Sequence, residues 1–188
     1  MNTLLFLTDK IDIYFRKISE SSHKTNPMLN ESHQYYSTSV EFIVEALELI
    51  NKDAGGLSGK KFIDAGCGVG IICGIARECG LDSFGIEINP ILNDASGTMF
   101  PEVKFYNVDI MNFNEYSNFD IVFYFIPFQD RDIQLKFKKK IENDINIGSY
   151  IISFDKYYDN TKSETKDERF IGIESENIVN KIWKKICK

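Results

Sequence analysis

Between residues 61 and 155 the sequence alternates short apolar segments with amphipathic ones. Strands are expected at 61–66, 83–88, 103–109, 119–128 and 148–155, and helices at 69–80, 89–99 and 130–144. Strands that alternate with helices in this way form parallel sheets with helices packed on both faces. The chain is therefore predicted to be an α/β protein with a three-layer, doubly wound, mostly parallel sheet.

The alternation stops after Asp155. The polar residues 156–168 predict a loop, and residues 169–175 and 178–186 predict two further strands with a short connection. Two consecutive strands joined in this way form an antiparallel hairpin. We expect it to close one edge of the sheet, so that a C-terminal strand runs antiparallel to the others.

The N-terminal residues predict an amphipathic helix, with apolar side chains at helical spacing at Leu4, Leu7, Ile11, Phe15 and Ile18. The apolar run is too short for a signal peptide or a membrane span, so no membrane association is expected. A polar loop leads to a second helix, which we expect to begin at a cap formed by Ser37, Thr38 or Ser39. We therefore divide the chain into an N-terminal helix and lid segment, 1–39, and a domain, 40–188.

Charge and cysteine content exclude some functions. A net charge of −6 and a pI near 5.0 argue against a general nucleic-acid coat, which needs a strongly cationic surface. The cysteines form no CxxC pair and stand near no histidine cluster, so no metal site is expected at Cys67, Cys73, Cys79 or Cys187. Reduced thiols in a cytoplasmic protein are the simplest interpretation.

The segment FIDAGCGVG places three glycines, Gly66, Gly68 and Gly70, directly after the first predicted strand. A dinucleotide-binding turn needs a small residue at position 71, where this chain has Ile71, so NAD binding is disfavoured. No lysine and hydroxyl residue follow the glycines, so the turn is not a triphosphate-binding loop either.

Two acidic residues accompany this turn. Asp64 stands at the end of the first predicted strand and would repel a pyrophosphate, whereas Glu87, at the end of the next strand, is placed to accept hydrogen bonds from the hydroxyls of a ribose. Together they predict a nucleoside whose remaining portion is cationic. S-adenosylmethionine, which carries a ribose, a sulfonium and an ammonium, fits this description.

The sequence resembles the class I, Rossmann-like SAM-dependent methyltransferases from about Lys60 to the terminal hairpin. FIDAGCGVG, FGIEINP, FYNVDIMNF and FDIVFYFIPF are similar, in order and spacing, to the first four motifs of that family. The resemblance implies S-adenosylmethionine as the cofactor. It also implies a set of cofactor-binding residues, namely Asp64, Ala65, Gly66, Cys67, Gly68, Gly70, Glu87, Ile88, Asp109, Ile110 and Tyr124.

In the roles that the resemblance implies, the first two glycines let the methionine portion approach the main chain. Asp64 lies near its ammonium, Glu87 holds the ribose, Ile88 flanks the adenine and Asp109 faces the adenine amino group. The residues alone leave other interpretations open: Asp64 could cap the following turn, Glu87 could be an exposed strand end, and Asp109 could be a helix cap.

The methyl acceptor is expected beyond the end of FDIVFYFIPF, at the crevice between the first and fourth strands. Tyr124 and Tyr36 are candidate catalytic residues, and Tyr36, Pro127 and Phe128 are expected to bind substrate, although the aromatic residues of this strand could equally be core. The sequence FIPF lacks the polar residue and the second proline found in amino-directed methyltransferases. Adenine-N6 and glutamine acceptors are therefore disfavoured, and lysine amines, hydroxyls, thiols and carbon nucleophiles stay open.

Three functions follow from this resemblance. The first is methyl transfer to a protein side chain or a small molecule. The second is RNA methylation, with the lysines of KFKKKI, residues 136–141, contacting phosphates, although these lysines are also explained as the solvated face of a helix. The third is a binding protein that keeps the fold without catalysis. Neither the oligomeric state nor the acceptor is indicated by the sequence.

Overall fold

A computed structural model of the 188-residue chain describes residues 39–154, 167–176 and 182–188. The predicted N-terminal helix, the lid segment with Tyr36 and most of the predicted loop at 156–168 lie outside the described residues. Within them, no helix combines the length and the apolar content that a membrane crossing needs.

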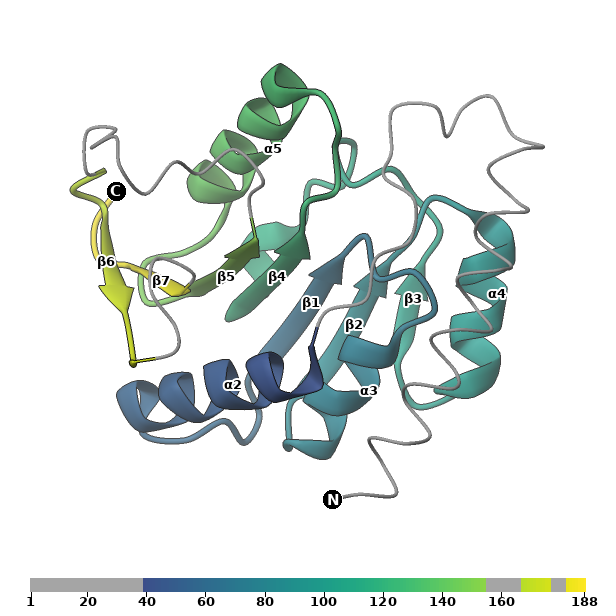
Figure 1. Ribbon diagram of the computed structural model, residues 1–188, viewed down its shortest axis with the longest axis horizontal. Coiled ribbons are helices and arrows are strands. Elements are labelled where there is room, and N and C mark those ends of the chain that lie inside the picture. Colours follow the sequence, from purple (N-terminus) through teal and green to yellow (C-terminus); the bar gives the residue numbers. More distant parts are fainter. Residues whose placement is uncertain (1–38, 155–166, 177–181) are drawn as a thin grey trace.

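The described residues form one seven-stranded sheet with the order β3-β2-β1-β4-β5-β7-β6 (Figure 1). β7 runs antiparallel to both of its neighbours, and the other pairings are parallel. The predicted fold class, including the antiparallel C-terminal strand, is thus confirmed. The strands are β1 (Lys61–Ala65), β2 (Asp82–Ile86), β3 (Lys104–Tyr106), β4 (Ile121–Phe125), β5 (Tyr150–Phe154), β6 (Phe170–Ile173) and β7 (Ile182–Lys185).

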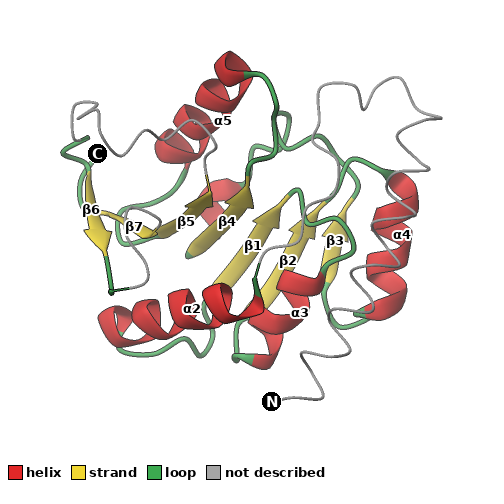
Figure 2. Ribbon diagram, in the orientation of Figure 1, coloured by secondary structure: helices red, strands yellow, loops and turns green. Residues whose placement is uncertain are grey.

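The helices cover both faces of this sheet (Figure 2). They are α2 (Val40–Ala54), α3 (Ile71–Glu78), α4 (Pro90–Met99) and α5 (Arg131–Asp144), with a 3-10 turn, η2, at Tyr116–Asn118. Successive side chains of a strand point to opposite faces, so Phe123 of β4 packs in the core under α2 and α3, whereas Tyr124 packs in the core under α5. The two apolar cores and the sheet between them make the three layers.

Side-chain caps fix where two of the helices begin. The Ser39 hydroxyl accepts a hydrogen bond from Phe42 N at 3.3 Å, which identifies Ser39 as the cap among the three residues expected. Asn89 Oδ1 accepts one from Ile91 N at 3.0 Å and precedes Pro90, whose missing N–H has no cost in the first turn. The Asn89 cap sets the position of the chain directly after β2.

Two strands are shorter than their apolar runs predicted. The run at 119–128 forms a strand only over β4, because Ile126 turns to a φ of 38° and Pro127 has no N–H to donate. The run at 103–109 forms a strand only over β3. Asp109 then uses its side chain to hold the main chain locally, whereas the side chain of Asn107 bonds to the main chain at Glu87. In both places the chain leaves the sheet at its carboxyl edge.

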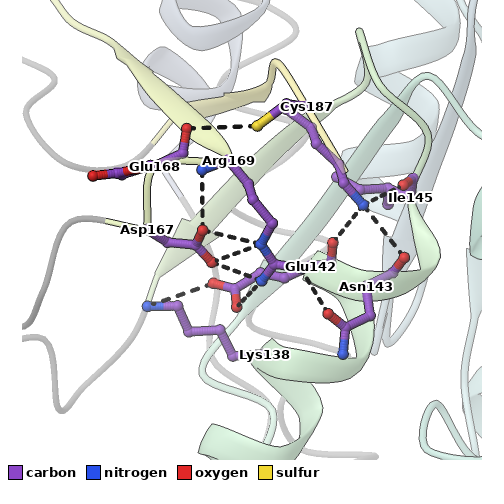
Figure 3. A network of polar contacts seen from close by, with 9 residues as sticks. Lys138, Glu142, Asn143, Ile145, Asp167, Glu168, Arg169 and Cys187 are labelled. Atoms are coloured by element: carbon purple, nitrogen blue, oxygen red, sulfur yellow. Dashed lines mark hydrogen bonds and ion pairs between the residues drawn. The ribbon is translucent and has the colours of Figure 1, made fainter.

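The terminal hairpin is tied to α5 through a buried lysine. Figure 3 shows its acceptor residues Glu142, Asn143 and Ile145 near Arg169 and Cys187. Lys185 is 5% exposed, and its Nζ donates to the carbonyl oxygens of Glu142, Asn143 and Ile145 at 2.8, 3.3 and 2.8 Å. Carbonyls at the end of a helix have no partners within the helix, so the ammonium satisfies groups that would otherwise need water.

Replacing this lysine should destabilise the protein. Lys185→Met retains most of the buried aliphatic chain but leaves the carbonyls at the end of α5 without a donor. We expect the free energy of unfolding to fall by about 1–3 kcal/mol. Urea denaturation measures the change, with Lys139→Met on the exposed face of α5 as the control. Equal stability of the two variants would contradict this role for Lys185.

Candidate functional site

The strand order reverses between β1 and β4, and the loops that follow these strands meet at the carboxyl edge of the sheet. Ligands of open α/β sheets bind at such a reversal. The glycine turn after β1 is attached to the end of β2, because Gly66 N and Cys67 N both donate to Ile86 O at 2.9 Å. A Cβ built on Gly66 would lie 3.9 Å from Pro127 Cβ, so the loop after β4 borders the same turn.

The glycines of this turn serve two purposes. Gly70, with a φ of 79°, begins α3, and a Cβ there would come within 2.7 Å of the Phe105 ring, so the position must be glycine for packing. Gly66 has a φ of 91°, but a Cβ there would have Pro127 Cβ, 3.9 Å away, as its nearest neighbour. The bare main chain at Gly66 therefore faces open space that a ligand can use.

Glu87 lies one residue beyond β2 and is 8% exposed. Its Oε2 accepts a hydrogen bond from Gly68 N at 3.0 Å, and its Oε1 accepts one from Asn89 N at 2.7 Å. Burial raises the pKa of Glu87 to about 7, an effect opposed by these main-chain donors. The alternative that Glu87 is an exposed strand end is wrong. Each carboxylate oxygen can accept a second hydrogen bond, so the side chain is held in place and can still bind a ligand.

Asp64 ends β1 next to this carboxylate and is 3% exposed. Among the described residues no donor bonds to its carboxyl group, so it does not cap the turn, contrary to one interpretation of the sequence. Burial, and secondly the nearby Glu87, raise the pKa of Asp64 well above its usual range. A buried acid without a partner is unfavourable in the protein alone, and it indicates a cationic or hydrogen-bond-donating ligand.

The predicted adenine-contacting residues follow β2 and β3. Ile88 is 40% exposed, as expected for a residue that flanks a ligand ring. Asp109 Oδ1 accepts a hydrogen bond from Met111 N at 2.8 Å, so one oxygen of Asp109 caps the local turn as the alternative interpretation proposed. Ile110 is 8% exposed and packs in the core under α5.

Asn107 was not predicted as a site residue. Its Nδ2 donates to Glu87 O at 2.7 Å and to Ile88 O at 3.1 Å, so it clamps the main chain that carries both residues. The only signal in the sequence is an asparagine directly after an apolar run, which is a common turn residue. The contact crosses from one strand to its neighbour and cannot be read from local spacing.

Ala65 and Cys67 are 1% and 6% exposed, so their side chains belong to the core of the turn. Cys67 packs with Cys73 in a small cluster, and burial raises the pKa of both thiols. Neutral buried thiols are poor nucleophiles. Cys67 thus acts as a small residue that fits the bend, and both residues can reach a ligand only through their main chain.

The residues predicted to lie near the methyl acceptor occupy different places in the structure. Tyr124 is 1% exposed and Phe128 is 9% exposed, and both rings pack against Phe137, with centroids 5.2 and 5.6 Å away. Strand alternation turns Tyr124 toward α5 rather than toward the crevice. This burial does not favour the catalytic and cofactor-binding roles expected for Tyr124. Phe128 lies in the same core. Pro127 is half-buried and borders the glycine turn. Tyr36 lies outside the described residues.

The buried acids should make the stability of the ligand-free protein depend on pH. The pKa of Glu87 in the folded protein exceeds its ordinary value of 4.5, so folding takes up a proton. This stabilisation is complete at acidic pH and is lost as the pH rises through about 7. It amounts to roughly 3 kcal/mol at most, since each pKa unit corresponds to about 1.4 kcal/mol.

Urea denaturation between about pH 5 and pH 8 measures this dependence. Asp64→Asn should make stability depend less steeply on pH. The amide does not titrate, and it also removes the negative charge next to Glu87. Asp94→Asn, which changes an exposed acid of α4, should leave the slope as it is in the wild type. The same slope in all three proteins would show that Asp64 does not contribute to it, and a wild-type protein without any slope would show that neither buried acid titrates with folding.

Comparisons with known proteins identify the fold. No family model and no curated protein matches the sequence. Among solved structures, an RNA methyltransferase from Salinibacter ruber in complex with S-adenosyl-L-homocysteine is 19% identical, with a TM-score of 0.56, over 80% of this chain and 92% of its own. TehB from Haemophilus influenzae is 20% identical, with a TM-score of 0.52, over 64% of this chain and 42% of its own.

A sugar N-methyltransferase from Streptoalloteichus is 14% identical, with a TM-score of 0.51, over 65% of this chain and 57% of its own. The chain thus matches nearly the whole length of the Salinibacter protein and shorter parts of the other two. At these identities the likeness concerns the fold and not the substrate. The chain has the class I, Rossmann-like fold of the SAM-dependent methyltransferases.

Proposed function

We propose that the chain is a SAM-dependent methyltransferase that binds its cofactor at the carboxyl edge of β1 and β2. The observation that carries this proposal is the juxtaposition of the open turn at Gly66 with two buried acids, Asp64 and Glu87. A nucleoside with a cationic tail fits these groups, whereas a pyrophosphate would meet a carboxylate without a counterion. When bound, S-adenosylmethionine supplies a methyl group activated by its sulfonium.

Each residue has a distinct part in holding the cofactor. Asp64, to which no described residue donates, would accept hydrogen bonds from the ammonium. Glu87 would accept hydrogen bonds from the ribose hydroxyls with the lone pairs that Gly68 and Asn89 leave free. Ile88 lies against the adenine, and the second oxygen of Asp109 accepts from its amino group. The remaining predicted residues act through the main chain or packing, namely Ala65, Gly66, Cys67, Gly70 and Ile110.

The protein's contribution to methyl transfer is positioning and exclusion of water, which can lower a barrier by about 7–11 kcal/mol in favourable cases. The loop that faces the acceptor, Phe125–Phe128, contains no acidic, basic or amide side chain. The side chains of this loop therefore cannot hold a planar amine by hydrogen bonds or act as a general base. This favours an acceptor on a small molecule or a protein side chain whose nucleophile needs little help in losing its proton.

RNA is the second candidate acceptor, because the Salinibacter protein is an RNA methyltransferase. The lysines of α5 give this candidate little support. Lys140 Nζ lies 2.8 Å from Asp144 Oδ2 and 2.9 Å from Asn114 Oδ1, and Lys138 Nζ lies 4.0 Å from Glu142 Oε1. These lysines are partly neutralised within the protein. RNA binding through them would weaken steeply with salt, which a titration at two salt concentrations would reveal.

Incubation of the protein and a cell extract with methyl-labelled cofactor tests the proposal. We expect label to enter the small-molecule or protein fraction, and label in the RNA fraction would select the second candidate. Cofactor binding without transfer to any fraction would favour a binding protein with this fold instead. Absence of cofactor binding would refute the proposal.

Glu87→Ala should weaken binding of S-adenosylmethionine by roughly 1–3 kcal/mol, because hydrogen bonds to an ionised group are lost. Isothermal titration calorimetry measures the change. Asp94→Ala, on the exposed side of α4, is the control and should bind as the wild type does. Unchanged affinity in Glu87→Ala would remove this residue from the site.

Gly66→Val should abolish cofactor binding by placing a branched side chain in the space beside Pro127. Valine is also strained at the φ of 91° found there. Gly148→Val is a matched control, because Gly148 has a φ of 90° and open space around it but lies away from the carboxyl edge. A normal titration with folded Gly66→Val would show that the turn does not contact the ligand.

A further inference from the structure

Asp64 and Glu87 form a pair of buried carboxyl groups on adjacent strand ends. In the parallel pairing of β1 with β2, Asp64 is opposite Gly85 and Ala65 is opposite Ile86, so Glu87 follows directly beside the end of β1. The two side chains are 3% and 8% exposed, and each charge disfavours the other. We call these two residues the acid pair.

The two carboxyl groups of the acid pair differ in the hydrogen bonds that they accept. Two main-chain N–H groups hold Glu87, and no donor among the described residues holds Asp64. None of the ion pairs between described residues involves either carboxyl group. The pair therefore has no counterion within the part of the protein that is described.

Among the described residues, the groups packed around the acid pair do not supply a charge that would offset it. From the turn and α3 come the thiols of Cys67 and Cys73, which burial keeps neutral. From β3 and its following loop come the carbonyl of Tyr106, which accepts from Glu87 N at 3.0 Å, and the amide of Asn107. Two adjacent acids in these surroundings are not ionised together, so in the ligand-free protein they retain a proton near neutral pH.

The two forms of the cofactor differ in the charge that they bring to this place. S-adenosylmethionine has two positive groups, a sulfonium and an ammonium, and one carboxylate of its own, so its net charge is positive. S-adenosylhomocysteine has a neutral thioether in place of the sulfonium, so its net charge is zero. Apart from the methyl group the two molecules have the same hydrogen-bonding groups. A protein that distinguishes them electrostatically needs charges that respond to the sulfonium, and a pair of acids that exchanges a proton provides such a response.

We propose that the acid pair, Asp64 and Glu87, discriminates between the two cofactor forms by releasing a proton to solvent when S-adenosylmethionine binds and keeping it when S-adenosylhomocysteine binds. This inference rests on the proposed function, since it concerns the same pocket. Both acids are then ionised opposite the cationic cofactor, and they take up a proton again once the methyl group and its charge have left. The preference for the methyl donor over the spent cofactor consequently decreases as the pH falls.

Calorimetric titrations of the wild-type protein with each cofactor form test this at about pH 6, 7 and 8. The number of protons released follows from repeating each titration in two buffers of different ionisation enthalpy. We expect S-adenosylmethionine to release about one proton more than S-adenosylhomocysteine does below about pH 7. Its Kd should fall by up to about tenfold for each pH unit in that range and then level off.

Asp64→Asn provides the matched variant, because the side chain that it replaces makes no hydrogen bond to a described residue. One of the two acids is gone in this variant, while Glu87 stays buried. The difference in protons released should therefore become smaller, and the ratio of the two Kd values should depend less on pH than in the wild type. Asp94→Asn, which removes an exposed acid of α4 and the same formal charge, should behave as the wild type does.

The outcomes separate this inference from the function on which it rests. If neither cofactor form binds to the wild-type protein, the proposed function fails and the inference fails with it. If both forms bind and release equal numbers of protons, or none, only the inference is overturned. The measurement on the wild-type protein decides this without any variant, so poor folding of Asp64→Asn would not leave the question open.

Discussion

The carboxylate of Glu87 connects the two segments on which the site depends. By accepting hydrogen bonds from Gly68 N and Asn89 N it fixes the glycine turn after β1 to the cap of α4 after β2. Burial of an acid is unfavourable, and these main-chain donors offset part of that cost. Asn107 adds a third strand to the arrangement by holding the carbonyls of Glu87 and Ile88. The carboxyl edge of β1, β2 and β3 is therefore one connected unit.

The order of the elements was predictable because each strand and helix carries its own hydrophobic period. The run at 61–66 is followed by glycines and a helical pattern, and this arrangement recurs with Asn89 and Pro90 as a helix start, so the α/β class follows from local sequence alone. The ends of the strands were not predictable in this way. The apolar run through Phe128 continues past β4, because Phe128 is buried in the core outside the sheet.

The candidate site was predictable where residue type and place along a strand are sufficient. An acid at a strand end beside a glycine turn, as at Asp64 or Glu87, is visible in the sequence. The face of β4 that Tyr124 occupies could not be read from the sequence, because it depends on α5 packing against that face. Asn107 was missed because its function is to hold a neighbouring strand. In both cases the deciding contact joins residues far apart in the sequence.

The main chain is strained at Ile126, directly after the end of β4. A β-branched residue at a φ of 38° costs on the order of 1–3 kcal/mol, and such strain persists only when neighbouring contacts impose it. Ile126 N donates to Phe154 O at 2.8 Å, which continues the pairing of β4 with β5 for one more hydrogen bond. The next residue, Pro127, then turns toward Gly66. The strained turn thus brings the apolar side chain of Pro127 against the glycine turn, which the proposed function assigns to the cofactor.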